Sequence, residues 1–191
     1  MTNTPGAVVE VRDLHQVFET GGQGLVALEH FSLDIRSGEF VAVVGPSGCG
    51  KSTLLRVLAG LDQASSGIMT IDGRPVSGTR ERTGVVFQKP ALFPWLNVLD
   101  NVMFGPKMRG VANDEARSQA RHYLRAVGLK DFEAYPVYNL SGGMQHRVAL
   151  ARSLIGRPDL LLMDEPFGAL DAQTRGTMQD LLIEIWQDDA S

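Results

Sequence analysis

The sequence has little cysteine, no long apolar run and no excess of positive charge. Cys49 is its only cysteine, which excludes an internal disulfide and makes a reducing compartment such as the cytosol its natural setting. No apolar stretch approaches the roughly 20 residues that span a bilayer, and residues 1–13 lack the pattern of a signal peptide. The formal net charge of −4 argues against nucleic-acid binding, which usually needs a basic surface. Any role at a membrane is therefore expected to depend on a partner.

What the sequence does contain is a series of short strand-like segments that alternate with helical ones, within a length that suits one domain. Phe40–Val44 and Leu160–Met163 are apolar throughout, as in strands covered on both faces. Such units indicate a parallel sheet with helices on both faces, and residues 95–152 read as a helical subdomain. Further strands are predicted at Ala7–Arg12, Phe31–Ile35, Ile68–Ile71 and Gly84–Phe87, helices at Ser52–Ala59, Val111–Gly128, Val148–Ile155 and Thr174–Trp186, a loop at Phe18–Gly24, a turn at Ser37-Gly38 and a frayed start at Met1–Gly6.

The segment Gly45-Pro46-Ser47-Gly48-Cys49-Gly50-Lys51-Ser52 matches the phosphate-binding loop G-x-x-x-x-G-K-[ST], between a predicted strand and a predicted helix. Its glycines let several backbone N–H groups converge on one anion, and the helix that follows adds a partial positive charge. Lys51 is suited to the terminal phosphates, and the Ser52 hydroxyl to Mg²⁺. Thr53 completes the candidate phosphate-binding residues. The alternative is a glycine-rich turn that matches by accident, against which the strand and the helix weigh.

Two acids end the second apolar strand, in Leu160-Leu161-Leu162-Met163-Asp164-Glu165. Ligands bind at the carboxyl ends of strands in α/β sheets. Asp164 is suited to the Mg²⁺ shell, and Glu165 to orienting or deprotonating an attacking water. The alternative is that both acids merely stop the strand before Pro166, but a nucleotide site needs such groups beside its phosphate loop.

A third motif, Asn139-Leu140-Ser141-Gly142-Gly143-Met144-Gln145-His146-Arg147, precedes the helical run Val148–Ile155. Ser141 is suited to cap that helix, and the glycines let a phosphate approach its N-terminus. Taken alone it would be an ordinary helix start. Taken with the other motifs, in the same order along nearly the whole chain, it resembles the LSGGQ signature of the ABC ATPases. His146 stands where glutamine is commoner, at a position expected on the helix surface.

The resemblance implies a P-loop NTPase core, with a mostly parallel sheet and helices on both faces, an N-terminal antiparallel β subdomain and a helical subdomain, all in one domain over residues 1–191. It places Phe18 on adenine, although a core phenylalanine is the alternative. It places Gln88, in Val86-Phe87-Gln88-Lys89-Pro90, near Mg²⁺ and the attacking water, although a surface amide is the alternative. Ser141, Gly142 and Gly143 would contact the nucleotide of a second subunit, and Asp171 would belong to the D-loop.

The same resemblance implies an ATP- and Mg²⁺-dependent ATPase that acts as a homodimer or pseudo-dimer. It would drive a membrane permease from the cytoplasmic face of the cell membrane, with a solute-binding protein in the same system and no nucleic acid. The finer match is to importers of nitrate, sulfonate or taurine, through Phe93-Pro94-Trp95, Met144 and Gly168-Ala169-Leu170-Asp171. The apolar residues of Pro90–Val98 are either local core or, where exposed, a partner surface.

One family element is missing from the sequence. The resemblance implies a switch histidine at the end of a further strand after Glu165, yet all four histidines precede Glu165 and the chain ends at Ser191. We therefore expect an incomplete record of a longer protein, with doubtful activity by itself and with a gap or a collapse between Phe40–Val44 and Leu160–Met163. Two alternatives remain open: a soluble ABC ATPase outside transport, and an ATP-binding module that does not hydrolyse.

Overall fold

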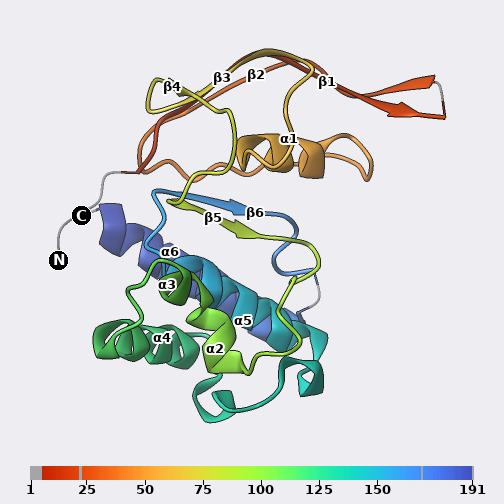
Figure 1. Ribbon diagram of the computed structural model, residues 1–191. Helices are drawn as coiled ribbons and strands as arrows, with labels where there is room; N and C mark the ends of the chain where they lie inside the picture. The colour runs from red at the N-terminus through yellow and green to blue at the C-terminus, as the bar shows by residue number, and fades with distance from the viewer. Residues whose placement is uncertain (1–5, 22, 169, 191) are drawn as a thin grey trace. The chain divides into compact units, whose positions relative to one another are not determined.

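The computed structural model describes residues 6–21, 23–168 and 170–190. They form two compact units, the first comprising the residues up to Thr83 together with Asp189 and Ala190, and the second covering Gly84–Asp188. Each unit is described by itself below (Figure 1). The frayed start predicted for Met1–Gly6 lies, apart from Gly6, outside the described residues, as do Gly22 of the predicted loop and Ala169 of the motif Gly168–Asp171.

The first unit contains an antiparallel sheet with the strand order β2-β1-β3-β4. β1 is the inner strand of a long hairpin, and its side chains Val9, Val11 and Leu14 are fully buried. The strands predicted at Ala7–Arg12, Phe31–Ile35 and Ile68–Ile71 are confirmed, but the first two are longer than expected and take up most of the loop predicted at Phe18–Gly24. Their bounds are β1 Val9–Thr20, β2 Gln23–Ile35, β3 Ser66–Ile71 and β4 Arg74–Pro75.

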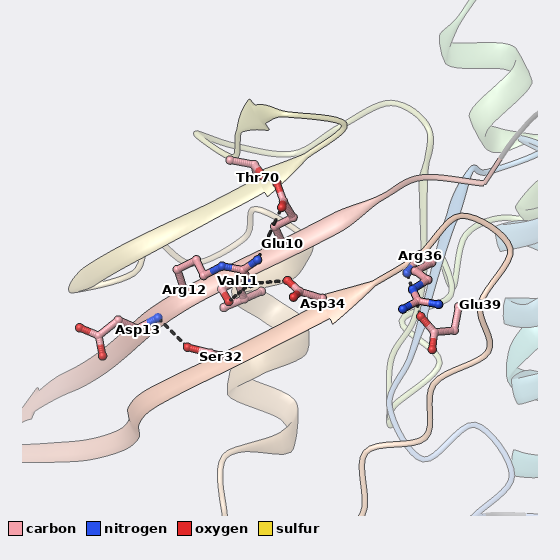
Figure 2. Close-up of polar contacts among 9 residues, drawn as sticks. All are labelled: Glu10, Val11, Arg12, Asp13, Ser32, Asp34, Arg36, Glu39 and Thr70. Carbon is pink, nitrogen blue, oxygen red and sulfur yellow. Dashed lines mark hydrogen bonds and ion pairs between the residues drawn. The ribbon is translucent and has the colours of Figure 1, made fainter.

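Polar side chains link neighbouring strands across this sheet (Figure 2). Thr70 Oγ1 donates to Glu10 Oε2 at 3.2 Å, joining β3 to β1, and the guanidinium of Arg12 pairs with Asp34 on β2. These pairs are exposed to solvent, where an ion pair typically contributes about 0–1 kcal/mol. They help to fix which residues of neighbouring strands lie opposite one another. The buried side chains of β1 contribute the larger share of the stability.

An irregularity interrupts β1 at Asp13, which has a positive φ of 50° and whose backbone N–H donates to Ser32 Oγ at 2.9 Å. The register of β1 shifts on both sides of Leu14. Gly67 on β3 lies against this bulge, with a φ of +97°, and a Cβ there would stand 2.5 Å from the carbonyl oxygen of Asp13. Only glycine fits at this position, so the bulge and Gly67 require each other.

The segment Phe40–Val44 is not a strand, and the prediction of a strand covered on both faces is wrong. Phe40 is 58% exposed and Val44 88% exposed. A strand forms only where its N–H and C=O groups find a partner, and no strand pairs with this segment within the part of the chain that the structure describes. Apolar sequence alone therefore did not decide its conformation. The turn predicted at Ser37-Gly38 is confirmed.

One helix completes the described part of the first unit. α1, at Lys51–Leu58, begins one residue before the predicted start and buries Leu54, Val57 and Leu58. It lies along the sheet and contacts β2 (Figure 1). The phosphate-loop motif thus runs directly into a helix whose apolar face is anchored in the unit.

The second unit pairs two strands, β5 at Thr83–Val86 and β6 at Leu160–Met163, which run in the same direction (Figure 1). β6 has the predicted bounds, but Leu162 is its only buried residue, so the burial expected on both faces is wrong. Among the described residues, five helices accompany the strands: α2 Val98–Val102, α3 Phe104–Met108, α4 Asp114–Ala126, α5 Gly142–Leu154 and α6 Ala172–Ala190, with the 3₁₀ turns η1 Lys130–Phe132 and η2 Val137–Asn139.

The positions at which α4 and α5 begin are set by capping residues in the local sequence. Asn113 accepts a hydrogen bond from Ala116 N at 2.9 Å and so begins α4 three residues after the predicted start at Val111. α5 begins at Gly142, well before the predicted Val148, because Ser141 caps it. The apolar faces of α2, α4 and α5 meet in a core that includes Val98, Val102, Ala120, Leu124, Val148 and Ala151.

Candidate functional site

The phosphate-loop motif lies in the first unit, where it curls around its own lysine. Lys51 Nζ donates to the carbonyl oxygens of Gly45 at 2.9 Å and Pro46 at 2.8 Å, and lies 3.8 Å from Cys49 Sγ. A lysine in this position holds its positive charge at the centre of the loop. Phosphate oxygens can replace these carbonyl oxygens, because a hydrogen bond between two ions is stronger than one between an ion and a neutral carbonyl.

The shape of the loop depends on glycine. Gly48 and Gly50 have φ angles of +82° and +95°, which L side chains rarely adopt. A Cβ on Gly50 would also stand 2.4 Å from the carbonyl oxygen of Ala27 on β2. Gly50 precedes the first turn of α1, whose N–H groups are directed out of the helix start. The arrangement suits an anion, and Ser52 is exposed there with its hydroxyl.

The remaining phosphate-loop candidates follow from this local geometry. Ser47 and Cys49 are at or near the surface of the loop, and Thr53 lies in the first turn of α1. Phe18 lies in the same unit, opposite Leu25 in the β1–β2 hairpin, and is half-buried. Its ring is accessible enough to contact a ligand.

The acids of the second unit follow β6, as predicted. The backbone N–H of Asp164 donates to the carbonyl oxygen of Val86 at 2.9 Å, which extends the pairing of β6 with β5. Glu165 has a φ of +46° and an exposed side chain. A non-glycine residue in this left-handed region carries backbone strain, and such residues concentrate at functional sites.

Gln88 and Glu165 are in direct contact although 77 positions separate them. Gln88 Nε2 donates to Glu165 Oε2 at 3.0 Å. The two residues for which a catalytic role was predicted therefore meet in the structure, together with Asp164 beside Glu165. A carboxylate with one oxygen held by an amide keeps its other oxygen available for a water.

The signature motif begins α5. Ser141 is the N-cap, and its Oγ accepts from Met144 N at 3.3 Å, as its sequence predicted. Gly142 is exposed and Gly143 is half-exposed. Because neither residue has a side chain, the backbone at the start of the helix is not covered there. The helix is also bound to the preceding turn, because Gln145 Nε2 donates to the carbonyl oxygens of Val137 and Leu140.

Asp171 has a structural role. Its carboxylate accepts from the backbone N–H of Thr174 at 2.9 Å and from the Thr174 hydroxyl at 2.6 Å. These bonds stabilise the charged form and lower the pKa of the Asp171 carboxyl. Asp171 thus caps the start of α6.

The loop after Gln88 is anchored by residues that sequence reasoning missed. Asn101 is fully buried; its Oδ1 accepts from Phe93 N, and its Nδ2 lies within 3.2 Å of the carbonyl oxygens of Phe93, Leu96 and Asn97. Arg152 on α5 donates to the carbonyl oxygens of Pro90 and Ala91 and lies over the Phe93 ring. Burial lowers the pKa of its guanidinium. A polar residue within an apolar helical pattern was the available signal for Asn101.

The apolar residues of Pro90–Val98 divide between the two alternatives. Leu92, Phe93 and Leu96 are half-buried, and Leu92 packs against the core of the second unit. Trp95 is 75% exposed. Most of the cluster is therefore local core, and Trp95 is the residue that remains for a partner.

The burial of His146 differs from the prediction. It was expected on the surface of its helix, yet it is only 7% exposed. Its Nδ1 lies 2.9 Å from the carbonyl oxygen of Gly142 and its Nε2 lies 2.9 Å from that of Gln88. The contact with Gln88 spans 58 positions, so no local pattern could have revealed it.

Comparison with known proteins identifies the family. Residues 28–168 match the family model described as ABC transporter. The chain belongs to this family. Its members' ATP-binding subunits hydrolyse ATP, so the chain is an ATP-binding cassette with ATPase chemistry. The match includes the phosphate loop, Gln88, the signature motif and Glu165.

Individual relatives agree with this assignment. The chain is 52% identical over 180 residues to a nitrate import ATP-binding protein of Synechocystis, and 48% identical over 179 residues to a taurine import ATP-binding protein of Jannaschia. It is 49% identical over 180 residues to an uncharacterised ABC transporter ATP-binding protein of Methanocaldococcus jannaschii. These matches cover 93–94% of the chain and 67% of each relative, so the chain spans about two thirds of their length.

Solved structures confirm the fold. The dimeric structure of a bacterial ABC transporter cassette matches with a TM-score of 0.89 at 33% identity, over 95% of this chain and 84% of that one. A dimeric post-hydrolysis state of an ATP-binding cassette bound to ADP and Pi matches with a TM-score of 0.88 at the same coverage. The predicted class, a P-loop NTPase with an N-terminal antiparallel sheet, a parallel sheet and helices, is therefore correct. Within the described residues, no helix combines the length and the apolar character needed to cross a membrane.

Proposed function

We propose that this cassette is the ATPase subunit of an importer for a small anionic or zwitterionic solute of the nitrate, sulfonate or taurine kind. The observation that carries the proposal is identity of about half over more than nine tenths of the chain with subunits named for nitrate and taurine import. The solute would be selected by a permease and a solute-binding protein.

The residues present fit ATP and Mg²⁺. We infer that Gly45–Thr53 hold the phosphates, with Lys51 turning from the carbonyls of Gly45 and Pro46 to the terminal phosphates. Mg²⁺ prefers a few protein oxygens together with phosphate oxygens and waters, and Ser52, Gln88 and Asp164 would supply them. When bound, the ion would neutralise charge on the phosphates. Phe18 would contact the adenine.

For hydrolysis, we infer that Glu165 accepts or orients the proton of the attacking water, held in place by Gln88. Ser141, Gly142 and Gly143 at the start of α5 would bind the phosphates of ATP held by a second cassette, which makes the active form a dimer. Support comes from the two matched structures, both of which are described as dimeric. Asp171 would contact the neighbouring site from the D-loop.

The subunit would act peripherally at the cytoplasmic face of the cell membrane, bound to permease subunits. A deletion strain tests this. Loss of the gene should abolish uptake of labelled nitrate, taurine or an alkanesulfonate, and only one of them, while a copy with Lys51→Ala should fail to restore it. Undiminished uptake of all three solutes would contradict the proposed substrate class. Absence of ATP hydrolysis by the full-length protein together with its permease would contradict the ATPase role itself.

A further inference from the structure

His146 connects two segments whose roles in hydrolysis are otherwise separate. It lies in the second turn of α5, the helix that begins with the signature motif, and its ring reaches the backbone of Gln88. Gln88 in turn donates its side-chain amide to Glu165 at 3.0 Å. His146 therefore links α5 to the backbone of Gln88, and the Gln88 side chain links that residue to Glu165.

The direction of the bond to Gln88 is determined by chemistry. A carbonyl oxygen can only accept, so the 2.9 Å contact with Gln88 is a hydrogen bond in the ring forms that carry a hydrogen on Nε2. The other neighbour, Gly142 O, is an acceptor as well. A neutral ring has one N–H and can donate to only one of the two oxygens, whereas a doubly protonated ring donates to both. Either form with hydrogen on Nε2 maintains the link to Gln88.

The position of the ring favours a specific role over simple filling of space. The side chain is 7% exposed, and a buried carbonyl left without its donor costs about 1–3 kcal/mol. Arg152, further along α5, holds the carbonyl oxygens of Pro90 and Ala91 in the same loop. Side chains of α5 thus contact three backbone carbonyl oxygens of the loop after β5. The one that His146 contacts belongs to Gln88, whose side chain contacts Glu165.

We propose that His146 is a positioning residue for ATP hydrolysis. Through Nε2–H it holds the backbone of Gln88, and it thereby keeps the Gln88 amide on Glu165 and couples that pair to the start of the signature helix. The inference rests on the proposed ATPase function. It assigns His146 no contact with the nucleotide, so its loss should affect turnover and leave nucleotide binding by the phosphate loop unchanged.

The test compares three variants of the full-length protein with its permease. His146→Leu removes both ring hydrogen bonds at similar volume. His146→Gln offers an amide donor for the Gln88 carbonyl. His122→Leu is the matched control, because His122 lies on α4, exposed, and contacts the ring of Tyr123. The measurements are kcat and KM for ATP, the dissociation constant for ATP, and the thermal midpoint.

We expect His146→Leu to lower kcat by about 10- to 100-fold, because a displacement of about 1 Å in catalytic groups has effects of this order. KM and the dissociation constant should stay within about threefold, which at 1.4 kcal/mol per tenfold is a small change in binding. His146→Gln should recover most of kcat, and His122→Leu should behave as the wild type. A kcat loss in His146→Leu that glutamine does not restore would indicate a merely structural role and overturn the proposal.

A spectroscopic measurement separates positioning from stability. In protein labelled with ¹⁵N-histidine, the Nε2 resonance of His146, assigned by its loss in the variants, should show a bound proton at neutral pH. An unprotonated Nε2 would overturn the proposal even if His146→Leu were inactive. Unchanged kcat in His146→Leu beside an active wild type would overturn this inference alone, whereas a wild type without ATPase activity would overturn the proposed function together with it.

Discussion

The side-chain amide of Gln88 donates to the carboxylate of Glu165, with 3.0 Å between Nε2 and Oε2. Gln88 follows β5 and Glu165 follows β6, two neighbouring parallel strands. Adjacent parallel strands end at the same edge of the sheet, which is where α/β proteins concentrate their ligand-binding groups. The pair therefore marks the end of the sheet at which the chemistry of the second unit takes place.

Replacing Glu165 tests the role of its carboxylate. Glu165→Gln should retain ATP binding but lower the turnover number by about 10²–10⁴, the usual contribution of a positioned general base. The replacement keeps an oxygen that can accept from Gln88, so the loop should not be disturbed. Turnover is measured by phosphate release and binding by titration with labelled ATP. A variant with a turnover number close to the wild-type value would exclude this role.

Lys51 should carry much of the affinity for the terminal phosphates. Lys51→Ala removes the ammonium that lies among the loop carbonyls and should weaken ATP binding at least about 10-fold, since charged hydrogen bonds contribute about 1.5–3 kcal/mol. The matched control is Lys130→Ala, an exposed lysine at the start of η1. Isothermal titration with Mg·ATP measures both. Equal affinity for the Lys51 variant and the control would refute the assignment of the phosphate loop.

Asn101 should contribute more to stability than any other asparagine in its region. Asn101→Ala leaves several buried backbone groups of residues 93–97 without a partner, so we expect the free energy of unfolding to fall by about 2–4 kcal/mol. Asn97→Ala is the comparison, because Asn97 only caps α2 through Asp100 N and its loss should cost about 1 kcal/mol. Urea denaturation measures both values. The reverse order would show that the loop does not depend on Asn101.

The Asp171 cap should make the stability of α6 depend on pH at the acid end. Because hydrogen bonds from Thr174 lower the pKa of Asp171 in the folded protein, its stabilising effect is fully present above the unfolded pKa of about 3.9. It is lost as pH falls through the lower folded value. The difference in thermal midpoint between wild type and Asp171→Ala should therefore shrink as pH falls below about 4. A difference that is constant down to pH 2.5 would contradict the cap.

How much of this could be predicted from the sequence depends on how local each feature is. The phosphate loop and the Ser141 cap are set by neighbouring residues, and both were predicted. The strand at Leu160–Met163 was also predicted, although it depends on pairing with β5, which lies far away in the sequence. The burial of His146 and the hydrogen bonds of Asn101 depend on segments far along the chain, and neither was predicted. Phe40–Val44 shows the converse error, because its apolar pattern indicated a strand, while strand formation requires a partner that the described residues do not provide.

The exposed segment Phe40–Val44 has a consequence for handling the protein. The segment contains five consecutive apolar residues, of which four are β-branched or aromatic and one is alanine. Its backbone is accessible to another polypeptide. Short uncharged segments of this kind promote intermolecular β pairing. We therefore expect this segment to promote self-association of the 191-residue polypeptide. Light scattering should show growth of oligomers with concentration, and Val43→Lys should suppress it.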